Sequence, residues 1–156
     1  MKKIIYSPGE PSGIGPDLII KLTSSKLWED IRIPIITVGD PKLFTDRAAV
    51  LKKKIKILEL DSLDQVRKNI KGLLQIIKVS KCSNTKPGKL YKSNAQYVLD
   101  NLNYSVKQTL LNERTALVTG PLSKENIISI DKSFTGHTEF YKKSYQKQRC
   151  FDDACI

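Results

Sequence analysis

Hydrophobic and polar positions change their period several times along the chain, from strand-like to helix-like and back. Short apolar runs bounded by turn residues indicate strands, and apolar residues at three- and four-residue steps indicate helices. The strand candidates are residues 4–6, 33–39, 55–60, 73–79 and 116–119. Strands that alternate with helices in this way predict an α/β fold with a largely parallel sheet and flanking helices.

The longest helical pattern opens at Asn94, and a second covers Leu43–Leu51. The helix after Asn94 has a single apolar stripe, made of Ala95, Val98, Leu99, Leu102, Val106 and Leu110. The run 33–39 is almost wholly apolar, which is typical of a strand buried on both faces, and Pro34 must then lie at its start. Residues 116–119 also read as a buried strand, and Cys82–Lys89 as a polar loop.

Two loops rich in glycine and proline follow directly after strands. Ser7–Asp17 follows the first strand, and Thr119–Lys124 follows the last. In a parallel sheet the carboxyl ends of the strands meet at one edge, where ligands bind, so we expect the two loops to share a cleft. The glycines of the first loop fit neither the dinucleotide-binding fingerprint nor the P-loop. Their spacing favours a structural strand-to-helix turn.

His137 is the only histidine, and it lies in the sequence Gly136-His137-Thr138-Glu139. An imidazole, a hydroxyl and a carboxylate in succession can bind a phosphate or carboxylate, or transfer a proton. The alternative is a loop histidine satisfied by local hydrogen bonds. One histidine does not make a convincing metal site. Lys124 could be a phosphate ligand, but a solvated helix residue is the favoured interpretation.

The composition fits a globular protein: 156 residues, of which 40% are hydrophobic and 28% charged. We expect one domain or part of one. Neither a membrane-spanning run nor a signal peptide pattern occurs, so a cytoplasmic location is predicted. Cys82, Cys150 and Cys155 have no pairing or zinc-binding spacing, and we interpret them as reduced thiols.

The net charge of +11 raises the question of nucleic-acid binding. Lysines are scattered along the chain, their densest run is only Lys52–Lys54, and arginine is scarce. Neither aromatic interleaving nor a nucleic-acid reader motif accompanies the charge. A solvated basic surface is therefore favoured, and we expect neither nucleic acid nor membrane as a partner.

Three stretches resemble 4-hydroxythreonine-4-phosphate dehydrogenase, the NAD-dependent enzyme of pyridoxal phosphate (vitamin B6) biosynthesis. They are PGEPSGIGPDL from Pro8, VTGPLSKENI from Val118 and FTGHTEF from Phe134. Their order and separation, and Asp46-Arg47-Ala48 between them, also agree with the family. The resemblance covers residues 1–149 and matches the first half of the family's chain. We therefore expect residues 1–149 to be an incomplete N-terminal part of a dehydrogenase, and residues 150–156 to be a tail foreign to the family.

The resemblance implies a fold like that of isocitrate and isopropylmalate dehydrogenases, a homodimer, and a cleft completed by the partner subunit. It implies NAD and a divalent metal as cofactors, and it matches His137 and Thr138 to the family's substrate-binding pair. The implied reaction oxidises 4-phosphohydroxythreonine with NAD and then releases carbon dioxide. In the family, the metal-binding histidines and most NAD-contacting residues lie beyond FTGHTEF. No catalytic, cofactor-binding or metal-binding residue is therefore assigned in this chain.

Three hypotheses for function remain at this point. The first is a truncated 4-hydroxythreonine-4-phosphate dehydrogenase, without activity by itself. The second is a non-catalytic remnant that binds a metabolite or a subunit. The third, a basic nucleic-acid-binding domain, has only the net charge in its favour.

Overall fold

The computed structural model describes residues 2–153 of the chain, with side chains up to residue 146. The side chains of the predicted tail 150–156 lie outside this range, as do residues 154–156 entirely. The elements are β1 (Lys3–Ser7), α1 (Gly15–Thr23), α2 (Leu27–Asp30), β2 (Ile35–Val38), α3 (Pro41–Val50), β3 (Lys56–Glu59), η1 (Leu63–Gln65), β4 (Leu73–Ile77), η2 (Lys92–Asn94), α4 (Ala95–Leu111), β5 (Thr115–Thr119), α5 (Lys124–Ile128) and α6 (His137–Asp153).

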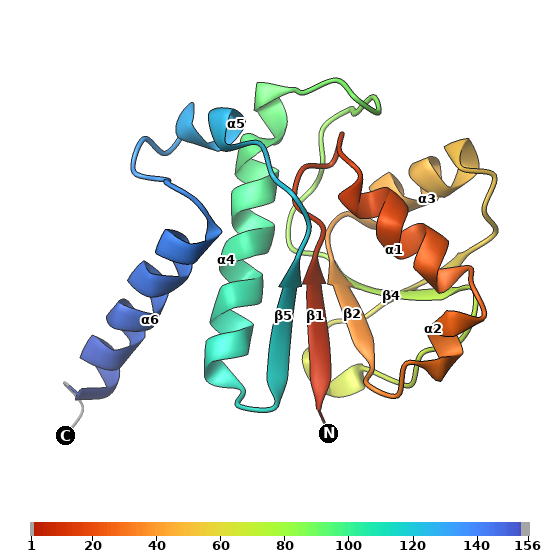
Figure 1. The fold of residues 1–156 in the computed structure, drawn as a ribbon, viewed down its shortest axis with the longest axis horizontal. Coiled ribbons are helices and arrows are strands. Elements are labelled where there is room, and N and C mark those ends of the chain that lie inside the picture. Colours follow the sequence, from red (N-terminus) through yellow and green to blue (C-terminus); the bar gives the residue numbers. More distant parts are fainter. Residues whose placement is uncertain (1, 154–156) are drawn as a thin grey trace.

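The five strands form one sheet in the order β3-β4-β2-β1-β5, and every neighbouring pair is parallel. This confirms the predicted α/β fold with a parallel sheet and flanking helices. Figure 1 shows α4 beside β5, α1 and α3 toward the other end of the sheet, and α6 extending away beyond α4. No helix in residues 2–153 has the length and apolar character needed to cross a membrane.

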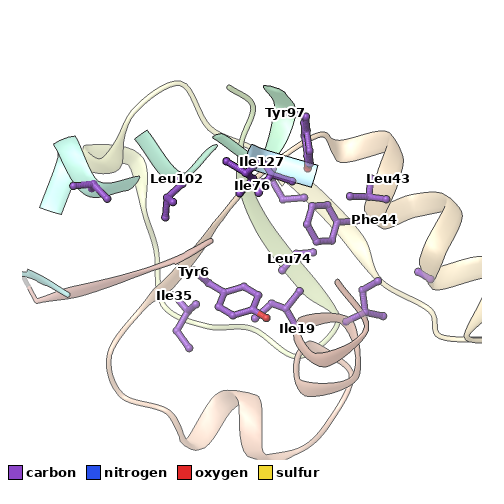
Figure 2. Packing of buried hydrophobic residues seen from close by; sticks show 14 of the residues in the cluster. Tyr6, Ile19, Ile35, Leu43, Phe44, Leu74, Ile76, Tyr97, Leu102 and Ile127 are labelled. Carbon is purple, nitrogen blue, oxygen red and sulfur yellow. The ribbon is translucent and has the colours of Figure 1, made fainter. Parts of the chain in front are cut away.

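Both faces of the central strands are buried. Ile5 and Ile36 are register partners and lie together in one apolar cluster. Their neighbours Tyr6 and Ile35 point to the opposite face, where they join Phe44 of α3 in the second cluster (Figure 2). All four residues of β2 are buried. The prediction of a strand covered on both faces is therefore confirmed.

β5 is an edge strand, and the prediction that it is buried is wrong. Its only pairing in the described sheet is with β1. Ala116 and Val118 point to one face and are exposed, with Val118 retaining 47% of its accessible surface. The apolar run looked buried because sequence pattern alone does not reveal which strand lies at an edge.

His137 begins a helix, whereas the glycine-flanked sequence suggested a loop. It is the first residue of α6, where the N–H of Phe140 donates to the carbonyl oxygen of Gly136 at 3.1 Å. Phe140, Tyr141 and Ser144 are half-buried on one side of this helix. The ring of Phe140 packs at 5.8 Å from that of Phe134. Phe140 and Tyr141 pack against the core cluster that contains Phe134, and these contacts hold α6 next to the preceding turn.

Candidate functional site

The two loops at the carboxyl edge of the sheet are held together by backbone hydrogen bonds. The N–H of Gly120 donates to the carbonyl oxygen of Ser7 at 2.7 Å, and the N–H of Glu10 donates to that of Pro121 at 2.9 Å. The expected proximity of the loops is confirmed. They pack directly on one another, however, where we expected a shared cleft.

Two glycines make this close approach possible. A Cβ on Gly9, whose φ is +77°, would overlap the carbonyl oxygen of Pro121. A Cβ on Gly120 would overlap the carbonyl oxygen of Pro8. Any side chain at either position would push the loops apart.

Arg47 of α3 fixes the first loop from its other side. Its side chain is buried, with 4% of its surface exposed. The guanidinium donates to the carboxylate of Asp17 at 2.7 Å and to the carbonyl oxygens of Gly13 and Pro11 at 3.2 and 2.7 Å. One rigid, planar cation thus binds three points of the loop.

Three amides of the first loop, those of Glu10, Ser12 and Gly13, are used within the protein. The N–H of Ser12 donates to the Glu10 carboxylate at 3.2 Å, and the N–H of Gly13 donates to the Glu10 carbonyl oxygen at 3.0 Å. A dinucleotide-binding turn instead presents its amides to the pyrophosphate. The geometry agrees with the structural turn predicted from the glycine spacing.

Glu10 also connects this loop to α5. The Nδ2 of Asn126 donates to the Glu10 carboxylate at 3.3 Å, and both side chains are 4% exposed. Asn126 further donates its backbone N–H to the Oγ of Ser123, which caps the helix. Neither Glu10 nor Asn126 was identified as a site residue from the sequence, although both lie in the stretches that resemble the family.

Lys124, at the start of α5, lies beside the third of these stretches. Its Nζ is 3.5 Å from the position that a Cβ on Gly136 would occupy, and the carboxylate of Glu139 is 3.2 Å from the same position. Lys124 is exposed, as the solvated interpretation predicted. The fold nevertheless places its ammonium group next to His137, which the sequence did not predict.

His137 is half-buried and Thr138 is exposed, both in the first turn of α6. Burial lowers the pKa of His137 below its usual 6.5, and the positive charge of Lys124 lowers it further. The imidazole is therefore neutral at pH 7. A neutral imidazole, a hydroxyl and an ammonium group together offer an anion a positive charge and several hydrogen bonds, and the carboxylate of Glu139 lies close to the same ammonium group.

A hollow of about 240 Å³ lies next to these residues. Its lining includes Phe134 and Thr135 of the third stretch, Leu99 of α4, and Phe140 and Lys143 of α6. It does not include His137 or Thr138. The hollow therefore adjoins the candidate site, and the pattern of the sequence gave no indication of it.

The residues present do not fit a divalent metal. Among the side chains that the structure describes, those of residues 2–146, no three of His, Cys, Asp or Glu gather closely enough to share an ion. His137 is the only imidazole of the whole sequence. We therefore derive no chemical step through a metal in this chain.

Cys82 is a free thiol, as predicted. Its Sγ lies 3.5 Å from the side-chain oxygen of Asn94. Burial, with a smaller contribution from Asp40, raises the pKa of this thiol to about 12. The thiol is thus protonated and a poor nucleophile at neutral pH. The side chains of the other two cysteines lie outside the described residues.

Residues 30–152 match the family described as "Pyridoxal phosphate biosynthetic protein PdxA". The chain belongs to this family. The chain is 33% identical over 149 residues to the 4-hydroxythreonine-4-phosphate dehydrogenase of Citrobacter koseri, covering 96% of the chain and 44% of that protein. It is also 33% identical over 148 residues to the 4-hydroxythreonine-4-phosphate dehydrogenase of Salmonella arizonae, and the match covers 95% of this chain and 44% of that protein. The PdxA relatives are dehydrogenases by name.

Solved structures agree on the fold. The 4-hydroxythreonine-4-phosphate dehydrogenase of Klebsiella pneumoniae superposes with a TM-score of 0.78 at 22% identity, covering 89% of this chain and 43% of that one. The enzyme from Burkholderia phymatum superposes with a TM-score of 0.79 at 18% identity, covering 90% of this chain and 42% of that one. The chain thus spans less than half the length of these PdxA relatives.

Proposed function

We propose that this chain carries the substrate-binding part of a 4-hydroxythreonine-4-phosphate dehydrogenase. The observation that carries the proposal is that all three family-like stretches meet in the fold. Glu10 of the first contacts Asn126 of the second, and Lys124 of the second lies beside His137 of the third. The reaction would oxidise 4-phosphohydroxythreonine with NAD, followed by decarboxylation, within pyridoxal phosphate biosynthesis.

In this proposal, His137 and Thr138 bind the substrate. The ammonium group of Lys124 offsets part of the negative charge of a phosphorylated ligand, and the exposed hydroxyl of Thr138 adds a hydrogen bond. NAD is the hydride acceptor, and we assign no residue of this chain to it. The divalent metal, the homodimer and the cytoplasmic location form part of the proposal on the strength of family resemblance.

A non-catalytic metabolite-binding role is the second candidate. It is favoured by the share of the relatives that the chain covers, 44%, and by the lack of a metal-binding cluster in the described residues. Both candidates predict the same ligand at the same residues. They differ in whether the chain turns over substrate.

The binding of 4-phosphohydroxythreonine, measured by calorimetry, tests the proposal. We expect His137→Ala and Thr138→Val each to weaken binding at least about tenfold, or about 1.4 kcal/mol, since each removes a hydrogen bond to an anionic ligand. Thr45→Val is the matched control, because Thr45 is an exposed threonine of α3 whose hydroxyl bonds only to the carbonyl oxygen of Pro41. Absence of saturable binding to the wild-type chain, or equal affinity in all variants, would refute the proposal.

A further inference from the structure

Glu10 is a buried carboxylate with no cation among its hydrogen-bond partners. It is 4% exposed, and its side chain accepts from the Ser12 N–H at 3.2 Å and from Asn126 Nδ2 at 3.3 Å. Both donors are neutral. Burying a carboxyl group that is hydrogen-bonded to neutral donors at 3.2 and 3.3 Å is costly, so stability alone does not explain its presence. A role for the position of this carboxylate is therefore indicated.

The loop that carries Glu10 is held from both sides. Arg47 binds it at Pro11, Gly13 and Asp17, and its backbone bonds to Pro121 in the loop after β5. The carboxylate of Glu10 is thus presented to α5 from a rigid support.

On α5, the side chains of Asn126 and Lys124 point in different directions. Residues two positions apart in an α-helix are separated by roughly 200° around its axis. Asn126 binds Glu10 on one side of the helix, and Lys124 reaches Gly136 and His137 on the other. A rotation of α5 about its axis would break the first contact and displace the second.

We propose that Glu10 is a positioning residue of the substrate site, which through Asn126 holds α5 in the orientation that places Lys124 beside His137. The proposal rests on the proposed function in treating His137 as a substrate ligand. Its test uses no ligand, so failure of substrate binding and failure of the positioning role are distinguishable.

The single histidine makes the orientation of α5 measurable. Diethylpyrocarbonate modifies the imidazole of the 156-residue chain, used at micromolar concentration. The pH dependence of the modification rate gives the pKa of His137, and His137→Ala serves as the blank. In the wild-type chain we expect a midpoint below 6.5. Lys124→Ala should raise this midpoint, because a nearby positive charge is removed, and it defines the largest shift that displacement of Lys124 can cause.

Glu10→Ala separates positioning from direct electrostatics. If Glu10 acted only through its charge, removing that negative charge would lower the midpoint. If it positions α5, the loss of Lys124 from the vicinity of His137 raises the midpoint toward the Lys124→Ala value. Asn126→Ala changes no charge and should raise it as well. Glu10→Gln keeps an acceptor oxygen for Asn126 and should not raise it.

Gln96→Ala is the control, because it removes an amide–carboxylate hydrogen bond of 2.7 Å to Asp100 on the exposed surface of α4. Its midpoint should equal that of the wild-type chain. Circular dichroism checks that each variant is folded, and Asn126→Ser replaces Asn126→Ala if that variant is not. Midpoints in Glu10→Ala and in the Asn126 variant that stay at or below the wild-type value would overturn the proposal.

Discussion

Gly120→Ala is expected to destabilise the chain by at least about 3 kcal/mol. The added Cβ would overlap the carbonyl oxygen of Pro8 and would lie 3.2 Å from the hydroxyl of Tyr6. The neighbouring atoms belong to the backbone of a loop that Arg47 fixes, so they have little freedom to move away. The hydrogen bond from Gly120 to Ser7 would be strained by the same shift.

Urea denaturation followed by circular dichroism measures this loss as a change in the free energy of unfolding. Gly88→Ala is the matched control. Gly88, unlike Gly120, has a left-handed φ of +77°, but nothing lies within 4 Å of the added Cβ, so the substitution should cost only about 1 kcal/mol, from backbone strain alone. Equal losses in the two variants would show that the loops after β1 and β5 are not closely packed.

The 156-residue chain is expected to show no dehydrogenase turnover. Hydride transfer needs a positioned nicotinamide next to the reacting carbon, and the amides of Glu10, Ser12 and Gly13 in the glycine-rich loop already bond within the protein. The described residues also lack a cluster that could hold the divalent metal implied by the family. A substrate pocket alone lacks the groups that make oxidation fast.

The assay follows the absorbance of reduced nicotinamide in purified protein supplied with NAD, divalent metal and 4-phosphohydroxythreonine. His137→Ala serves as the blank. Turnover above this blank would show that residues 1–156 are a working enzyme, and it would eliminate the metabolite-binding remnant as the second candidate.

Most of the fold was predictable because its strands are short apolar runs between turn residues. All five predicted strands occur, and Pro34 precedes β2 as expected. The exposure of Val118 was not predictable, since it depends on which strand ends the sheet. The helix that begins at His137 was missed because its glycine and polar start resembled a loop, while its stabilising contact, between Phe134 and Phe140, is tertiary.

The candidate site was predictable only in part. Gly136, His137 and Thr138 were identified from local residue types. The contact between Glu10 and Asn126 joins residues 116 positions apart, so no local pattern reveals it. Placement of the site's charges therefore required the three-dimensional structure.

Glycine spacing was similarly incomplete as a guide. It did not distinguish the glycines of the first loop, among which Gly13 is the least crowded, since an added Cβ would lie 3.2 Å from the carbonyl oxygen of Glu10. The tighter positions are Gly9, against the carbonyl oxygen of Pro121, and Gly15 and Gly120, both against that of Pro8. Spacing indicates that a turn needs glycine, but only the structure shows which glycine has a backbone oxygen against it.

The most direct test of the proposed substrate site is the NMR signal of the His137 ring during titration with 4-phosphohydroxythreonine. We expect a saturable shift and a higher pKa for His137, because a bound phosphate stabilises the charged imidazolium. Hydroxythreonine without the phosphate should give a much smaller effect. A His137 signal that responds to neither compound, or equally to both, would contradict the assignment of a phosphorylated substrate to this site.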